Sequence, residues 1–348
     1  MNRRSFVTRA GAVGGALAVS GVAAAQNEAN QISMDVEVHP SWLTWVTAAN
    51  ACLRALGVEC DNIDVAGHSG YAFHMCITDV VGVEGPTVLP WSDLDSRIRL
   101  AGRSTLSYAA SPWASDEEYR EADRHAFELA KREVDAGRPC VLWGIQPPEF
   151  GTVIGYDGDY YIHKWSGAPN TPLKLKYDET TNPGGAYLLT FPTASTTPLV
   201  TADMMALRNA LDFLNRPSYD ASLSFGLAAY DPWIAALNAK RAHGFGNNYC
   251  AQCFSNGRQY ARDFITRLAE RNEHAAGPLD RTVIAYEECA DAMGIVAQLF
   301  PFPGPEEENI EDPITIDDAC RALAIARDAE IVAADAIREA LEVEWPGA

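Results

Sequence analysis

Residues 149–163 read EFGTVIGYDGDYYIH, and this stretch carries the strongest fold signal in the chain. Residues 152–156 and 159–162 are rich in β-branched and aromatic side chains, with Asp157-Gly158 between them. An Asp-Gly pair between two such runs predicts a β-hairpin, because both central positions of the tight turn need a positive φ. We therefore expect an antiparallel sheet in this part of the chain.

The segments upstream of this hairpin extend the prediction to an α+β fold. Residues 42–56 follow a helical period that stops at Gly57, a natural C-terminal residue. Ser115 and Glu118 form a capping box ahead of a helix over 116–135. Further strands are predicted over 139–144 and within 171–192. Helices therefore come early and the antiparallel sheet comes late in this portion.

After Thr197-Pro198 the predicted structure becomes entirely helical. The expected helices cover 201–215, 231–241, 255–273, 280–299 and 315–344. Asp231-Pro232 marks one helix start, and Thr315 with Asp318 marks another. The glycines and asparagines of residues 243–248 predict a surface loop. We expect an α+β domain over 39–198 and an all-α domain over 199–348.

The first residues have the features of an export signal. Residues 1–25 read MNRRSFVTRAGAVGGALAVSGVAAA, with Arg3-Arg4 ahead of a short apolar stretch and an A-x-A site. This pattern predicts a cleaved signal peptide of the twin-arginine type. The mature protein is then expected in the periplasm or outside the cell, with no membrane attachment after signal removal. Residues 26–38 are expected to form a mobile polar lead.

Composition excludes several partner classes. The 348 residues carry a net charge of −20, and removal of residues 1–25 leaves 24 basic and 47 acidic side chains, or −23. Nucleic-acid binding is disfavoured because phosphate neutralisation needs clustered Lys and Arg. No phosphate loop, dinucleotide fingerprint or H-E-x-x-H motif is present, so we expect no cofactor. The eight cysteines allow disulfides in an exported protein, and we expect at most one or two.

Four stretches together resemble a known family. They are TWVTAANACLRALGVE (44–59), AGHSGYAFHM (66–75), GRPCVLWG (137–144) and the hairpin EFGTVIGYDGDYYIH (149–163). Over residues 39–192 their order resembles papain-like folds of the bacteriocin-leader-peptidase type, and more closely the N-terminal domain of the butirosin biosynthesis protein H family. The resemblance implies a papain-like domain with an antiparallel sheet, followed here by the helical domain.

The resemblance also implies where a catalytic set would stand. In that fold a Cys at the start of the first helix attacks a carbonyl, a His on the sheet activates it, and an Asp or Asn orients the His. The corresponding positions here fall at Thr44, Glu149 and Lys164 beside His163. The usual triad is therefore missing, which makes the chain a pseudoenzyme candidate.

Two functions follow from these substitutions. The first is binding of a peptide or amide-like small molecule in a cleft between the first helix, the 67–76 segment and the hairpin. The second is an active amide hydrolase or acyltransferase with Thr44 as nucleophile. Glu149 or His74 would then be the base, and Asp157 or His163 would support it. A hydroxyl nucleophile is weak without an adjacent base, so this function requires Thr44 to lie close to one.

The densest polar and aromatic cluster is expected to contribute binding groups. It comprises His68, Tyr71, His74 and Cys76, with Trp45 as a further wall of the pocket. In an alternating segment His68, His74 and Cys76 point the same way and could serve as acid–base groups or soft metal ligands. The alternative is a loop that enters a buried strand, with His74 as a core histidine.

A third function, metal binding, depends on this cluster or on Cys250 and Cys253. These two cysteines form a lone C-x-x-C with His243 seven residues upstream. Zinc sites usually need a second pair of ligands at suitable spacing. The alternatives for Cys250 and Cys253 are a local disulfide or two unpaired helical cysteines.

Overall fold

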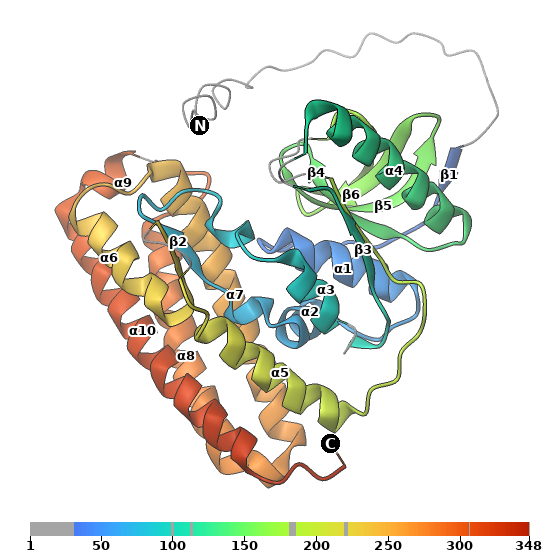
Figure 1. Cartoon of the computed structure of the whole chain (residues 1–348). Coiled ribbons are helices and arrows are strands. Elements are labelled where there is room, and N and C mark those ends of the chain that lie inside the picture. Colours follow the sequence, from blue (N-terminus) through green and yellow to red (C-terminus); the bar gives the residue numbers. More distant parts are fainter. Residues whose placement is uncertain are drawn as a thin grey trace. The chain divides into compact units, whose positions relative to one another are not determined.

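The protein is a mixed α+β chain with a helical C-terminal region (Figure 1). Its structure is a computed structural model that describes residues 31–348 except 99–100, 112–113, 181–185, 219–221, 306 and 348. The main sheet is antiparallel, in the order β3-β8-β4-β5-β6-β7, with β1 added to the end of β5. Its strands are β1 (Gln31–Ser33), β3 (Leu106–Ala109), β4 (Cys140–Ile145), β5 (Glu149–Asp157), β6 (Tyr160–Trp165), β7 (Ala168–Lys176) and β8 (Tyr187–Thr190). A separate antiparallel pair joins β2 (Cys76–Thr78) to β9 (Leu223–Phe225).

The predicted hairpin is present, but its turn lies one residue later than expected. Asp157 pairs with Tyr160, so the two turn residues are Gly158 and Asp159. Gly158 has φ 56°, whereas Asp159 is not among the residues with positive φ. The turn therefore needs only one left-handed residue, and glycine supplies it at the first central position.

A helix covers each face of the sheet. The predicted helix over 116–135 is confirmed as α4 (Asp116–Asp135), with the capping box between Ser115 and Glu118. Phe127 of α4 packs with Val153 and Tyr161 on one face. On the other face α1 (Thr44–Ala55) packs against β4 and β5 (Figure 1). Two layers of apolar side chains therefore hold the sheet between α4 and α1.

The remaining helices share one core with α1. They are α2 (Asn62–Ser69), α3 (Trp91–Ile98), α5 (Leu199–Leu214), α6 (Tyr230–Asn238), α7 (Gly244–Arg271), α8 (Ala276–Leu299), α9 (Glu307–Glu311) and α10 (Pro313–Glu342), with 3₁₀ turns η1 (Tyr71–Phe73), η2 (Gly85–Thr87), η4 (Gly226–Ala229) and η5 (Glu273–Ala275). Trp45 of α1, Phe264 of α7 and Leu323 of α10 belong to the same buried cluster. The change near residue 198 from mixed to entirely helical structure therefore does not separate two hydrophobic cores. In the described part of the chain no helix is both long and apolar enough to cross a membrane.

Residues 243–248 form the start of α7, so the predicted surface loop is wrong. The His243 side chain caps the helix by accepting a hydrogen bond from the Gly246 N–H at 3.2 Å. A Cβ atom at Gly246 would lie 2.3 Å from the Val81 carbonyl oxygen. Glycine is present here because the helix packs closely against another backbone segment, not because the chain turns. The last long helix also begins earlier than predicted, at Pro313 after the cap Asp312.

The second half of the expected mobile lead is part of the fold. Residues 31–33 pair with β5 as β1. Val36 and Val38 are buried with Ile154 and Ile162, so this segment is fixed by apolar burial. The expected signal peptide over 1–25 and residues 26–30 lie outside the described residues.

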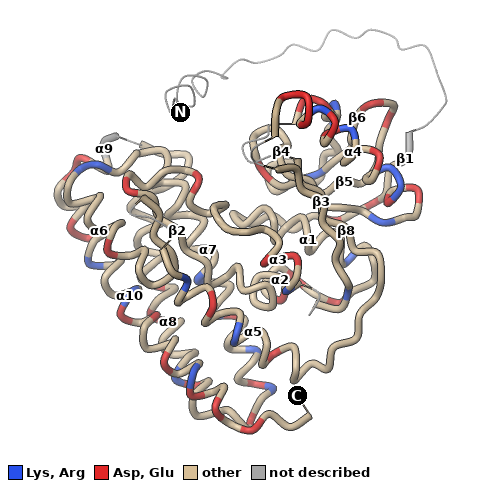
Figure 2. The backbone as a smooth tube through the Cα atoms, viewed as in Figure 1, with Lys and Arg blue, Asp and Glu red and all other residues tan. Residues whose placement is uncertain are grey.

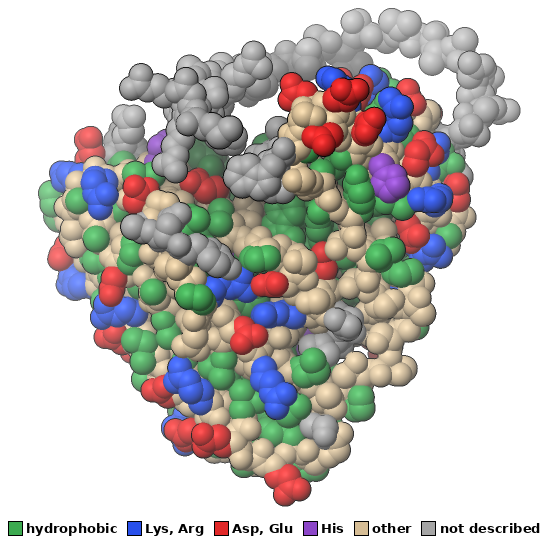
Figure 3. Space-filling view, viewed as in Figure 1, with side chains coloured by type: hydrophobic (Ala, Val, Ile, Leu, Met, Phe, Trp, Pro, Cys, Tyr) green, Lys and Arg blue, Asp and Glu red, His purple; other side chains and the backbone are tan. Residues whose placement is uncertain are grey.

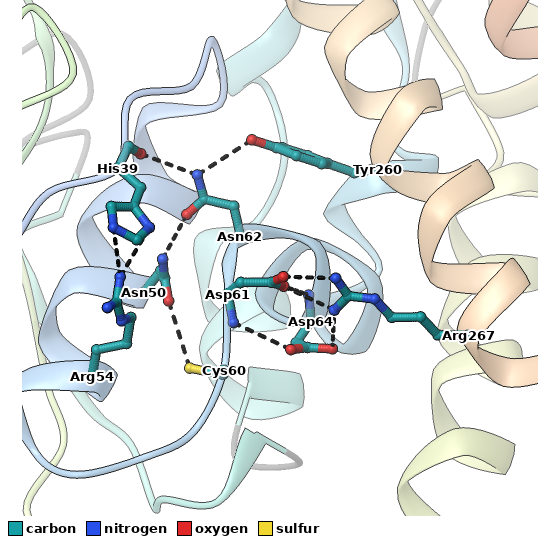
Figure 4. A network of polar contacts seen from close by, with 9 residues as sticks. All are labelled: His39, Asn50, Arg54, Cys60, Asp61, Asn62, Asp64, Tyr260 and Arg267. Atoms are coloured by element: carbon teal, nitrogen blue, oxygen red, sulfur yellow. Dashed lines mark hydrogen bonds and ion pairs between the residues drawn. The ribbon is translucent and has the colours of Figure 1, made fainter. Parts of the chain in front are cut away.

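A polar network fastens α1 and α2 to α7 (Figure 4). Asn50 of α1 donates to Asn62 of α2 at 2.8 Å, and Asn62 donates to the Tyr260 hydroxyl of α7 at 3.3 Å. Arg267 of α7 donates to Asp61 at 3.0 and 2.7 Å, and such charge-assisted bonds are stronger than neutral ones. The network fixes α1 relative to α7, the two helices that supply the candidate site.

Candidate functional site

The start of α1 meets the start of β5 at a side-chain hydrogen bond. Thr44 Oγ1 donates to Glu149 Oε2 at 2.6 Å, and the Phe150 N–H donates to Thr44 Oγ1 at 3.3 Å. The two bonds fix the direction of the hydroxyl, with its proton toward the carboxylate. The structure therefore brings together the two positions at which the resemblance implies a nucleophile and a base.

A third side chain, Tyr249 of α7, completes the group. Its hydroxyl donates to Glu149 Oε1 at 2.8 Å, so each carboxylate oxygen accepts one hydroxyl proton. Tyr249 lies 100 residues after Glu149. Sequence reasoning missed it because no local pattern in a segment interpreted as a loop points to a contact with β5. We call Thr44, Glu149 and Tyr249 the Glu149 site.

Burial raises the pKa of Glu149 above its ordinary value, while the hydrogen bonds from Thr44 and Tyr249 oppose this shift. Among the described residues, none forms an ion pair with this carboxylate, and no cation contributes to its pKa shift. Glu149 is nevertheless partly exposed. The site therefore holds a largely buried carboxylate, in a residue at the protein surface, that the described part of the protein does not neutralise.

Aromatic side chains surround Tyr249. Trp42 and Phe302 lie 6.4 and 5.6 Å from it, and 5.8 Å from each other, between ring centroids. Phe245 extends the group, with its ring 5.0 Å from Phe302. All four residues are at least partly exposed, Trp42 by 36%. Figure 3 shows that the face in view is hollowed between the sheet and the helices, with hydrophobic side chains on the visible walls.

The first turn of α1 presents free backbone donors beside Glu149. Its N-cap residue, Leu43, offers no side-chain hydrogen bond, and within the described residues the Thr44 N–H donates to no acceptor. Helix N-termini carry partial positive charge and unsatisfied N–H groups. The site thus combines a hydrogen-bond acceptor, Glu149, with a donor, the Thr44 N–H.

His163 and Asp157 do not join the Glu149 site. His163 lies opposite Val153 in the sheet, four residues along β5 from Glu149, and the two hydrogen bonds to the Glu149 carboxylate come from Thr44 and Tyr249 instead. Burial lowers the pKa of His163 to about 4. Asp157 is at the other end of β5, roughly 26 Å from Glu149 along an extended strand, and pairs with Lys174. Asp157 is therefore too distant for the supporting role expected of it, and His163 makes no hydrogen bond to Glu149 or Thr44 among the described contacts.

The 67–76 segment is not an alternating strand, so the expected common direction of its side chains is wrong. Residues 67–69 end α2, and Gly70 caps that helix with φ 81°. The segment continues as η1 and enters β2 only at Cys76. His68 and His74 are buried, and burial lowers their pKa values to about 4 and about 3. Both are neutral core histidines at pH 7.

Tyr71 and Trp45 lie beneath the Glu149 site without opening to solvent. The Tyr71 hydroxyl donates to the Pro86 carbonyl at 2.6 Å. Burial raises its pKa, with smaller contributions from Cys253 and Glu149. Trp45 is fully buried and its indole N–H donates to the Tyr187 hydroxyl at 3.3 Å. The exposed tryptophan at the site is Trp42, three residues earlier.

All eight cysteines are free. Cys250 and Cys253 are buried on one face of α7, where their thiols donate to the Gly82 and Trp42 carbonyls at 3.3 and 3.7 Å. Burial raises the pKa values of both thiols well above the ordinary value, so neither is activated as a nucleophile. Across the described residues, no three His, Cys, Asp or Glu side chains form a group that could hold a metal ion. The candidate metal ligands Cys76, Cys250 and Cys253 are thus not gathered into such a site.

No protein-family model matches the chain, and no curated protein matches it.

Proposed function

We propose that the Glu149 site binds a peptide or an amide-like small molecule. An amide offers one N–H donor and one carbonyl acceptor. The Glu149 carboxylate can accept from the N–H, and the free Thr44 N–H can donate to the carbonyl. The observation that carries the proposal is the Glu149 carboxylate, which belongs to a partly exposed residue, is held in place by two hydroxyls and is neutralised by no described cation.

This proposal includes a papain-like arrangement that lacks the Cys-His-Asp triad. The contact between the start of α1 and the start of β5 supports it. The position at which the family places an orienting carboxylate holds Lys164, whose ammonium donates to the Val36 carbonyl at 2.8 Å. A buried lysine committed to the backbone cannot orient a catalytic base, which favours binding over ordinary cysteine-hydrolase chemistry.

Titration of the purified protein with N-acetylglycine methylamide, followed by ligand-observed NMR, tests this function. We expect binding that weakens at least about tenfold in Glu149→Gln, because the ligand N–H loses its charged acceptor. Binding should weaken less in Thr44→Val, which keeps the backbone N–H but removes the hydroxyl that holds Glu149 in place. Glu287→Gln, which neutralises an exposed carboxylate on α8, is the matched control and should bind as the wild type does. Equal binding by all four proteins would refute the proposal.

A second candidate function is acyl transfer or amide hydrolysis, favoured by the 2.6 Å hydrogen bond from Thr44 Oγ1 to Glu149. Thr44 Oγ1 would form a bond to the substrate carbonyl carbon while its proton passes to Glu149. The proton would then move to the leaving amine as the C–N bond breaks, leaving an acyl ester on Thr44. The raised pKa makes ionised Glu149 a stronger base than an ordinary carboxylate.

Incubation with p-nitrophenyl acetate and mass spectrometry of the intact protein separates the two functions. An acyl adduct on the wild type that is absent from Thr44→Val and Glu149→Gln would establish the enzyme. Binding of the amide without any Thr44-dependent adduct would leave the binding function and exclude acyl transfer from this ester.

We also propose that the chain is exported through the twin-arginine route to the periplasm or beyond. Residues 1–25 supply the signal pattern. The eight free cysteines suit a chain that folds in a reducing compartment before export. Changing Arg3 and Arg4 to lysine should leave an uncleaved precursor in the cytoplasmic fraction, and unchanged export and processing would contradict the proposal.

A further inference from the structure

The ligand of the Glu149 site carries a positive charge: we infer that the site takes a primary ammonium or guanidinium group attached to the amide that it binds. This inference rests on the proposed function and names the chemical class of its ligand. It follows from the charge of Glu149, from the aromatic rings beside it and from the charge of the whole chain.

The charge of Glu149 is the first observation. Each oxygen of this carboxylate accepts one hydroxyl proton, from Thr44 at 2.6 Å and from Tyr249 at 2.8 Å. A carboxylate has about four lone-pair sites, so roughly half of its capacity to accept hydrogen bonds remains. Hydroxyl donors orient the group and leave its negative charge in place. A ligand cation would supply the missing partner in a partly desolvated place, where charge-assisted hydrogen bonds are strong.

The aromatic rings are the second observation. Trp42, Tyr249 and Phe302 lie within 6.4 Å of one another with interplanar angles of 69–83°. Tyr249 belongs to this group and also binds Glu149, so the rings adjoin the carboxylate. Cations are attracted to the faces of aromatic rings, to tryptophan most strongly. An apolar ligand would gain from the same rings, but it would leave Glu149 unpaired.

The charge of the whole chain is the third observation. Acidic side chains outnumber basic ones by 20, and Figure 2 shows them distributed over α4, α6, α8 and α10. A net negative surface raises the local concentration of cations and speeds their association. The same field disfavours a ligand with a carboxylate or phosphate near Glu149.

Three probes test the inference by NMR titration at pH 7.5 and low salt. N-acetyl-lysine methylamide carries the amide and the cation, N-acetyl-norleucine methylamide carries the amide with a neutral stem, and n-pentylamine carries the cation alone. We expect the lysine probe to bind at least about tenfold more tightly than the norleucine probe, because it adds a charge-assisted bond. In Glu149→Gln the two affinities should become equal, and in Glu287→Gln the preference should persist.

The outcomes separate this inference from the function on which it rests. Equal affinities of the lysine and norleucine probes for the wild type, both dependent on Glu149, would overturn the inference and leave amide binding standing. No Glu149-dependent binding by any probe would overturn both. Tight binding of n-pentylamine would support the inference with a free amine as the source of the charge. Weak binding of this amine beside tight binding of the lysine probe would support an amine carried on a peptide.

Discussion

Two glutamates in the described part of this molecule accept hydrogen bonds from tyrosines, and they differ in what else surrounds them. Glu330 of α10 is fully buried, and Tyr230 donates to it at 2.8 Å. Arg258 of α7 pairs with both of its oxygens at 3.0 Å. Glu149 accepts from Tyr249 and Thr44, is partly exposed, and has no cation partner among the described residues.

The difference indicates what each group is for. A buried charge must be paired and hydrogen-bonded to be tolerated, and Glu330 meets this requirement entirely from within the chain. Its network connects α6, α7 and α10, so its role is structural. Glu149 is oriented but not neutralised, which is the condition expected of a group whose partner comes from outside.

The largest expected effect is a loss of stability when the ion pair of Glu330 is broken. Arg258→Met should lower the free energy of unfolding by about 3–5 kcal/mol, because it leaves an uncompensated buried carboxylate. Arg321→Met, which removes an exposed arginine of α10, should change it by less than about 1 kcal/mol. Urea denaturation measures both, and a similar small change for the two variants would contradict the structural role of Glu330.

The next effect is the pH dependence of stability near Glu330. The carbonyl of His74 accepts a hydrogen bond from Arg258 at 2.6 Å, and burial lowers the pKa of the His74 ring to about 3. The unfolded chain therefore binds a proton at His74 below about pH 6.5 that the folded chain does not. The free energy of unfolding should then fall by up to about 1.4 kcal/mol per pH unit between pH 6 and 4.

Urea denaturation at several pH values measures this slope, and His74→Leu should make it shallower. Glu149 acts with the opposite sign. Its raised pKa means that the folded chain binds the proton more readily, so protonation of Glu149 favours the folded state as the pH falls. An unchanged slope in His74→Leu would show that His74 is not neutral in the core.

Removing the tyrosine hydroxyls compares the two sites directly. Tyr230→Phe should lower the free energy of unfolding by about 1–3 kcal/mol, because no solvent can replace the lost donor at a sealed carboxylate. Tyr249→Phe should lower it by less than about 1 kcal/mol, since both residues 149 and 249 are partly exposed and we expect water to replace the lost donor. Thermal or urea unfolding of both variants measures the two losses in the free energy of unfolding. Equal losses would mean that Glu149 is as inaccessible to solvent as Glu330.

The smallest expected effect on stability belongs to Glu149 itself. Glu149→Gln should change the free energy of unfolding by less than about 1 kcal/mol at pH 7, because removal of an unpaired charge offsets the loss of a hydrogen bond. The same variant should lose at least about tenfold in affinity for the lysine probe. A loss of several kcal/mol in the free energy of unfolding would instead show that Glu149 serves to stabilise the fold.

Elements with strong local signals could be predicted from the sequence. Ser115 and Glu118 cap α4 at the predicted residue, and the hairpin turn at Gly158 is one residue from its predicted place. Glycines were ambiguous, because Gly158 supplies a positive φ whereas Gly246 permits close packing inside a helix start. The same local pattern is compatible with a positive φ and with close packing, and only contacts with residues distant in the sequence distinguish the two roles.

The candidate site was predictable only in part. Thr44 and Glu149 are positions that the family resemblance implies, but Tyr249 and Phe302 reach the site through the packing of distant segments. His163 makes no hydrogen bond to the site, since its pairing with Val153 places it four residues along β5 from Glu149. A register shift in the pairing of β5 with β6 lies next to this pair, between Val153 and Gly155, and no sequence pattern reveals it.

The most direct test is a titration of the Glu149 side-chain carboxyl by ¹³C NMR, assigned with Glu149→Gln, with and without N-acetyl-lysine methylamide. We predict a pKa above the ordinary value of 4.5 in the free protein and a lower pKa when the probe is bound, since a nearby cation favours the ionised form. A pKa at the ordinary value that the probe does not change would contradict an available, unpaired carboxylate at this site.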